Sequence, residues 1–250
     1  MILINKPKYL TSYQAILKFK NQNPTYKNVK LGYVGTLDPM ATGLLIALED
    51  KENKDRNKYI GLTKTYEFEI LFGISTDSYD LLGLLKKIDP DYENKIESLD
   101  INQFVGKYIQ KFPPFSAKII NGKRLYNLSR NNLITESELP SFERKIFSLE
   151  VIQNQIKTKQ EILDEIKTAT KQIDGDFRQN EIINSWVEKS KQLNESYKLV
   201  KIKTLVSSGT YIRRLCVDIA DKYNSVALAY SINRTKVGDY DLKNAIQIDS

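Results

Sequence analysis

An aspartate in a glycine-bracketed loop is the first feature of this sequence that could carry chemistry. Asp38 lies in the segment 32–43, which reads GYVGTLDPMATG. The glycines permit dihedral angles that other residues avoid, and Pro39 disfavours helical angles at Asp38, so a rigid loop holds the carboxylate ahead of an apolar strand. An Asp-Pro pair alone is most often a turn element, so both a structural turn and a catalytic carboxylate stay open at this point.

The absence of histidine narrows the chemistry that is possible. It excludes Ser-His-Asp and Cys-His catalysis, HExxH zinc sites and any imidazole base. The single cysteine, Cys216, can form neither an internal disulfide nor a thiolate metal site. Neither GxxxxGK nor GxGxxG occurs among the eleven glycines. We therefore expect catalysis by carboxylate, amine, guanidinium or hydroxyl groups, without a metal or another cofactor.

The charge balance indicates an anionic partner. Lys and Arg number 38 and Asp and Glu 31, which gives a formal charge of +7. Basic side chains gain affinity for nucleic acid when they displace the counterions of phosphates, although a basic chain can also simply be soluble. The longest apolar run covers only residues 44–48, and Lys6 interrupts the first apolar stretch. The sequence therefore predicts a cytoplasmic protein that does not associate with membranes.

Strands and helices alternate along the chain, which predicts an α+β fold. Residues 66–72 alternate apolar side chains with Glu67 and Glu69, as in a strand with one covered face, and residues 200–206 repeat the pattern with lysines. Thr11 and Ser12 precede apolar residues at helical spacing, and residues 212–223 form a second amphipathic helix.

Residues 153–197 differ from the rest, because apolar residues recur at helical spacing on both sides of the turn 174–176. We predict a helical hairpin inserted at about 153–197. Its six lysines between positions 157 and 191 could clamp RNA, but a structural support that packs on the main sheet is the simpler interpretation.

The segment GTLDPxATG resembles the catalytic motif of the TruB family of tRNA pseudouridine synthases. Further family-like motifs follow in the same order along the chain: Asn5-Lys6-Pro7, Lys64-x-Tyr66, Thr76-Asp77 with Asp80, Pro113-Pro114 with Ser116-Ala117, and Ser208-Gly209-Thr210-Tyr211-Ile212-Arg213. The resemblance implies the pseudouridine synthase catalytic fold, a mixed and largely antiparallel central sheet with flanking helices.

The resemblance also implies roles for individual residues. Asp38 would be the nucleophile, Arg213 would hold it ionised, and Tyr66 would stack on the flipped uracil. Further substrate or RNA contacts are implied for Lys6, Tyr33, Lys54, Asp80, Tyr211 and Ile232. Tyr33 stands where the family usually has histidine, so stacking can persist there while a ring-nitrogen hydrogen bond cannot.

The implied function is the conversion of uridine to pseudouridine at position 55 in the T loop of tRNA, by a monomer that needs no protein partner. The alternatives are a catalytically idle tRNA-binding chaperone on the same fold and a pseudouridine synthase that acts on another RNA. We expect residues 1–250 to form one catalytic domain without a C-terminal RNA-binding PUA domain, since 236–250 are too few for a second core.

Overall fold

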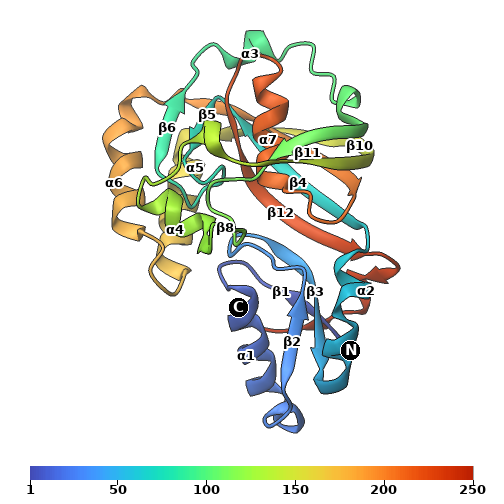
Figure 1. The fold of residues 1–250 in the computed structure, drawn as a ribbon. Helices are drawn as coiled ribbons and strands as arrows, with labels where there is room; N and C mark the ends of the chain where they lie inside the picture. Colours follow the sequence, from blue (N-terminus) through green and yellow to red (C-terminus); the bar gives the residue numbers. More distant parts are fainter. Residues whose placement is uncertain (250) are drawn as a thin grey trace.

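A mixed ten-stranded sheet organises the molecule (Figure 1). The structure is a computed structural model and describes residues 1–249. The strands of this sheet are β1 (Ile2–Lys6), β2 (Leu31–Val34), β3 (Thr42–Glu49), β4 (Lys64–Phe72), β7 (Gly106–Lys111), β10 (Ser141–Thr158), β11 (Ser196–Val206), β12 (Ala227–Val237), β13 (Tyr240–Asp241) and β14 (Ile246–Gln247).

The strand order is β14-β1-β3-β12-β4-β11-β10-β7, with β2 paired to β3 and β13 paired to β12. The pairs β1–β14 and β3–β12 are parallel, and the other pairs of this sheet within residues 1–249 are antiparallel. The prediction of a mixed, largely antiparallel sheet is confirmed. Figure 1 shows β1, β2, β3 and α1 at one end of the molecule and β4, β10, β11 and α7 at the other.

Helices and two small sheets surround the large sheet. The helices are α1 (Ser12–Gln22), α2 (Arg56–Ile60), α3 (Tyr92–Lys95), α4 (Leu125–Arg130), α5 (Lys159–Gln172), α6 (Gln179–Lys189) and α7 (Ile212–Asp221). The small sheets pair β5 (Ile74–Thr76) with β6 (Leu85–Ile88), and β8 (Ile119–Ile120) with β9 (Lys123–Arg124). Among the described residues no helix is both long and apolar enough to cross a bilayer.

Local sequence signals explain the elements that position the site. Helix α1 starts at a capping box, in which the Thr11 side chain accepts from the Gln14 N–H and the Gln14 side chain accepts from the Thr11 N–H. In β4, Tyr66, Phe68 and Ile70 are buried while the alternate residues are partly exposed. The strand predicted at 66–72 and the helix predicted from Ser12 are therefore confirmed.

The hairpin predicted at about 153–197 is shorter than expected. Its helices are α5 and α6, which cover 159–172 and 179–189, whereas residues 153–158 continue β10 and residues 196–197 begin β11. Ile156 pairs with Lys198 across these strands, so its helical spacing was coincidental. The true start of α5 is a second capping box, formed by Thr158 and Glu161.

The α5–α6 hairpin packs on the main body of the fold. Ile162, Ile166, Ile182 and Trp186 are buried in one core with residues of β4, β6 and β11. The Trp186 indole N–H donates to the Gly83 carbonyl at 3.1 Å, which satisfies the polar atom of the largest buried side chain. The hairpin is thus joined to the same core that supports the sheet.

Candidate active site

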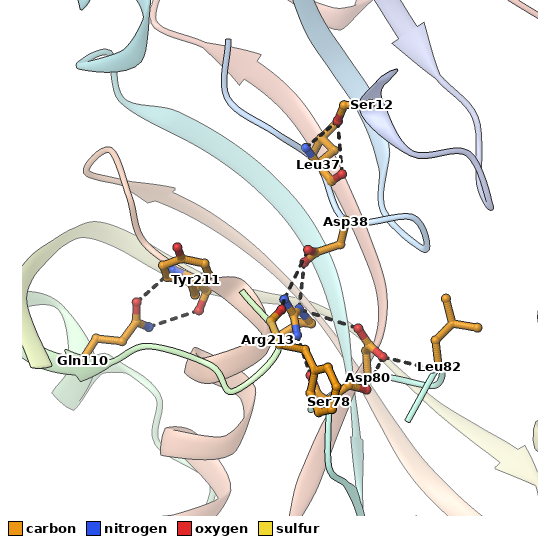
Figure 2. Close-up of polar contacts among 10 residues, drawn as sticks. Ser12, Leu37, Asp38, Ser78, Asp80, Leu82, Gln110, Tyr211 and Arg213 are labelled. Atoms are coloured by element: carbon orange, nitrogen blue, oxygen red, sulfur yellow. Dashed lines mark hydrogen bonds and ion pairs between the residues drawn. The ribbon is translucent and has the colours of Figure 1, made fainter. Parts of the chain in front are cut away.

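The loop between β2 and β3 carries Asp38 and is tied to α1. The Ser12 hydroxyl donates to the Leu37 carbonyl at 3.1 Å and accepts from the Leu37 N–H at 2.9 Å (Figure 2). After Asp38 the chain turns, because the Ala41 N–H donates to the Asp38 carbonyl at 3.0 Å. The backbone of Leu37, which precedes Asp38, is therefore fixed by the buried Ser12 at the start of α1.

Lys6 also holds the Asp38 loop, because its side chain donates to a carbonyl of that loop. Its side chain is fully buried, and its ammonium group donates to the carbonyls of Pro7, Leu10 and Pro39 at 2.8, 2.6 and 3.2 Å. The prediction that Lys6 contacts RNA or substrate is therefore wrong, because all three of its donors are used inside the protein. Burial lowers the pKa of Lys6 to about 7, although the nearby charge of Asp38 acts in the opposite direction.

The stability of the protein should depend on pH through Lys6. The folded-state pKa of about 7 lies below the ordinary value of 10.5, so between these values the unfolded chain binds more protons than the folded one. The free energy of unfolding should therefore rise with pH in this window, by up to about 1.4 kcal/mol per pH unit. Urea denaturation from about pH 7 to about pH 10 should show a steeper rise for wild type than for Lys6→Met. An equal rise of the free energy of unfolding with pH in both proteins would contradict a lowered pKa at Lys6.

Asp38 and Arg213 form the ion pair that the sequence predicted. The Nε and Nη2 groups of Arg213 donate to Oδ2 and Oδ1 of Asp38 at 2.7 and 3.2 Å (Figure 2). The side chain of Arg213 is 3% exposed and that of Asp38 is 37% exposed. The guanidinium is therefore enclosed by protein while the carboxylate faces open space, as required of a carboxylate that meets a substrate.

Arg213 is itself held by backbone carbonyls and a second carboxylate. Nη1 donates to the Ser78 carbonyl at 2.6 Å, Nη2 donates to the Phe115 carbonyl at 2.8 Å, and Nε lies 3.6 Å from Oδ2 of Asp80. Burial by itself would lower the pKa of Arg213, but the charges of Asp38 and Asp80 outweigh it and the pKa is raised. The guanidinium stays charged and keeps one orientation.

Asp80 is buried beside Arg213 and held by its own turn. It is 5% exposed, and its Oδ1 accepts from the Ser78 hydroxyl and the Leu82 N–H at 2.6 and 3.0 Å. Burial raises the pKa of Asp80 to about 6, and the Arg213 charge opposes that shift. Its oxygens are directed at Arg213 and at its own turn, and the residue also lines the second pocket, so its contact with substrate or RNA stays a prediction.

Asp38 lies where two pockets meet. The larger pocket has a volume of about 710 Å³, and its lining includes Asp38, Tyr66, Tyr211, Arg213 and Ile232. Such a volume lies in the range of roughly 300–1,000 Å³ that is typical of ligand sites. The structure thus brings the predicted catalytic and pocket-lining residues together from β4, β12, the Asp38 loop and the start of α7.

The second pocket shares Asp38 with the larger one, and several arginines line it. Its volume is about 530 Å³, and its lining includes Asp38, Tyr33, Arg124, Arg130 and Arg178. The last three bring guanidinium groups from β9, α4 and the start of the α6 helix. Asp38, Asp80 and Asp176 line the same pocket, so it presents charges of both signs.

Comparison with known proteins agrees with this geometry. Residues 22–170 match the family model described as TruB family pseudouridylate synthase, N-terminal domain. The tRNA pseudouridine synthase B of Ureaplasma urealyticum serovar 10 is 34% identical over 251 residues, which is 100% of this chain and 90% of the relative. The chain belongs to the TruB family of pseudouridylate synthases.

Two further comparisons support this TruB family membership and the fold. The tRNA pseudouridine synthase B of Aquifex aeolicus is 31% identical over 252 residues, which is 99% of this chain and 71% of the relative. A chain of a crystal structure of a Cbf5-Nop10-Gar1 complex matches with a TM-score of 0.57 and 20% identity. The match covers 98% of this chain and about half, 51%, of that one, and it shows a shared fold.

Tyr33 and Lys54 are the two remaining predicted RNA contacts of this TruB family chain, and only Tyr33 lies at a pocket that contains Asp38. Tyr33 lies on β2 and lines the second pocket, where an aromatic ring can stack on a base. Lys54 is exposed in the short helical segment Asp50–Asp55, and among the described residues it lines neither pocket. Its contact with an RNA phosphate remains a prediction for a more distant part of the substrate.

Several residues that shape the site were not assigned from the sequence. Arg234 is 1% exposed and donates to the carbonyls of Gly35 and Leu44 at 2.6 and 2.8 Å, which fixes both ends of the Asp38 loop. Gln110 accepts from the Tyr211 N–H and donates to its carbonyl at 2.8 and 3.1 Å (Figure 2). Their roles depend on carbonyl and amide groups far away in the sequence, so no local pattern indicated them.

Proposed function

We propose that this chain converts uridine to pseudouridine in tRNA, at position 55 of the T loop, with Asp38 as the nucleophile. The observation that carries the proposal is the ion pair of Asp38 and Arg213, in which the carboxylate is 37% exposed at the junction of two pockets and the guanidinium is buried. The relatives named tRNA pseudouridine synthase B support tRNA as the substrate.

The reaction exchanges one glycosidic bond for another within a single nucleotide. The bond between ribose C1′ and uracil N1 breaks, the base turns, and a bond forms between C1′ and C5. The C5 hydrogen is released to solvent as a proton, and N1 takes up a proton. Covalent attack by the Asp38 carboxylate splits this exchange into two easier steps. Because the free base must be retained between them, the reaction needs a pocket that holds the base beside Asp38, and Tyr66, Tyr211 and Ile232 line such a pocket.

The target base must leave its stack to reach Asp38. A uridine in a loop is less strongly stacked and unpaired more easily than one in a duplex, so flipping costs less there. Tyr66 is 8% exposed on β4, at the wall of the larger pocket, and its ring offers a surface on which the flipped uracil can stack. The proposal takes a monomer as the working form and residues 1–250 as one catalytic domain.

Basic side chains surround both pockets and can hold the phosphates of the T arm. They come from different elements of the chain: Lys118, Arg124 and Arg130 line one pocket or the other, and Arg144 lies beside Gly209 in the wall of the larger one. Phosphate contacts of this kind position RNA without reading its sequence.

The affinity for tRNA should therefore fall steeply as salt is added. Several released counterions correspond to a slope of roughly −3 to −5 in a plot of log K against log salt concentration. Filter binding or fluorescence anisotropy with the Asp38→Asn protein measures this without turnover. A flat response would show that phosphate contacts do not hold the RNA.

Release of tritium tests the proposed reaction. When tRNA labelled with tritium at C5 of its uridines is incubated with the purified chain, the C5–C1′ bond can form only if the label leaves. The proposal predicts release of one equivalent per tRNA, without added cofactor. A chain that binds the same tRNA and releases no tritium would be a binding protein, and the proposal would be wrong.

A further inference from the structure

The turn between α5 and α6 reaches the pocket that contains Asp38. Asp176, Phe177 and Arg178 all line the second pocket. The Asp176 carboxylate accepts from Nη2 of Arg130 in α4 at 2.7 Å, and the Asp174 carboxylate accepts from the Gln14 side chain of α1 at 3.2 Å. The hairpin is therefore more than a support at the back of the sheet, because its tip forms one wall of the site.

Within this tip, Arg178 makes a two-point ion pair and a contact with an aromatic ring. Its Nη1 and Nη2 groups donate to Oδ2 and Oδ1 of Asp77 at 2.7 and 3.2 Å, and the two side chains are only 11% and 14% exposed. Its guanidinium also lies over the Phe115 ring, 4.5 Å from the centroid. Planar guanidinium groups suit both kinds of contact, which lysine cannot reproduce together.

The backbone at Arg178 is unusual as well. Its dihedral angles are φ 61° and ψ 35°, in the left-handed region that most residues other than glycine avoid. Such a conformation costs on the order of 1 kcal/mol and persists where surrounding contacts determine it. Here the contacts of the Arg178 side chain with Asp77 and Phe115 hold the backbone in this conformation.

The two partners of Arg178 adjoin the two carbonyls that hold Arg213. Asp77 precedes Ser78, whose carbonyl accepts from Nη1 of Arg213 at 2.6 Å. Phe115 supplies its own carbonyl, which accepts from Nη2 of Arg213 at 2.8 Å. Arg178 therefore contacts Asp77 and Phe115, and the backbone at these two places supplies the carbonyls that accept from Arg213.

We infer that Arg178 is a positioning residue for the reaction, which acts on Asp38 through Arg213 and makes the tip of the α5–α6 hairpin part of the active site. The inference rests on the proposed function. Loss of Arg178 frees the turn at Asp77 and the irregular segment at Phe115, and the carbonyls of Ser78 and Phe115 shift with them. Arg213 then rotates, and the carboxylate that it aims is misplaced for attack.

Arg178→Asn tests this inference, since asparagine tolerates the left-handed conformation while the guanidinium is lost. With tRNA labelled at C5, kcat should fall by roughly 10- to 100-fold, the effect of a misplacement near 1 Å, while KM changes by less than about threefold. Arg178→Lys, which keeps the charge, should recover only part of kcat. Glu195→Gln, which removes an exposed ion pair with Lys159 at the base of the same hairpin, is the matched control and should behave as wild type.

A double-mutant cycle tests whether Arg178 affects kcat through Asp77. If Arg178 acts through Asp77, then Asp77→Asn combined with Arg178→Asn should lower kcat no further than the more damaging single change. A raised KM with unchanged kcat and a shallower salt slope would instead make Arg178 a phosphate ligand, and wild-type kinetics would make it only structural. Either result overturns the inference.

The NMR signal of the Arg213 Nε–H group gives a readout that does not need activity. In wild type the bond to Asp38 should hold this proton downfield and protect it from exchange, and Arg178→Asn should shift the signal and speed the exchange. If wild type showed no tritium release but this shift appeared, the proposed function would fail while the structural link survived. An unchanged signal in folded Arg178→Asn or Arg178→Lys protein would overturn the link itself.

Discussion

Replacing Asp38 with asparagine should abolish the release of tritium from tRNA while the fold and tRNA binding persist. The amide has nearly the shape of the carboxylate but is a poor nucleophile, so turnover should fall by at least about 10³-fold. The Asp38 side chain is 37% exposed at the pocket, so its replacement leaves the apolar core intact. Single-turnover assays with enzyme in excess over tRNA measure the loss without interference from product release.

The control for Asp38→Asn is binding under the conditions of the assay. Circular dichroism and tRNA affinity should match wild type within about twofold, because the phosphate contacts lie on other residues. The amide still offers Arg213 one oxygen acceptor, so the neighbouring carbonyls of Ser78 and Phe115 keep their roles. Turnover within tenfold of wild type would show that Asp38 is not the nucleophile.

Replacing Arg213 with lysine should lower turnover by about 100-fold or more, although the positive charge is kept. Arg213 makes four hydrogen bonds in one plane, to both oxygens of Asp38 and to two carbonyls. An ammonium group cannot span these acceptors, so it can neutralise Asp38 without aiming it. The fall should appear in kcat, since binding of tRNA does not depend on the buried guanidinium.

Arg214→Lys is the matched control on the same helix. Arg214 is also buried, but it pairs with Glu136 and Asp218, each at 2.7 Å, on a network separate from Asp38. Its replacement should lower the free energy of unfolding while kcat stays within a few-fold of wild type. Equal effects of the two substitutions on kcat would mean that general destabilisation, and not the aim of Asp38, explains the loss at Arg213.

The pairing at the centre of the site could be predicted because its motifs are local. Asp38 and Arg213 lie 175 positions apart, and the geometry of their contact is not written in any one segment. Each lies in a short motif that resembles the TruB family, and the resemblance implies that the two residues form a pair. The strand at Tyr66 and the helix that starts after Thr11 were also predicted, since alternation and capping are properties of neighbouring residues.

The errors have a common physical cause, which is that burial and strand pairing are decided by distant residues. The family-like motif Asn5-Lys6-Pro7 implied an RNA or substrate contact for Lys6, but the Pro39 carbonyl, 33 positions away, is one of three buried acceptors for its ammonium group. Ile156 looked helical by spacing, but β10 continues because β11 pairs with it. The turn at 174–176 was visible, whereas its contact with the Asp38 pocket was not.

A map of pseudouridine in tRNA tests the central claim most directly. An unmodified tRNA transcript is incubated with wild type or with Asp38→Asn, treated with a carbodiimide that marks pseudouridine, and read by primer extension. The account predicts one new pseudouridine, at position 55 of the T loop, with wild type and none with Asp38→Asn. Absence of pseudouridine with the folded wild-type chain at stoichiometric amounts, or equal modification by both proteins, would contradict it.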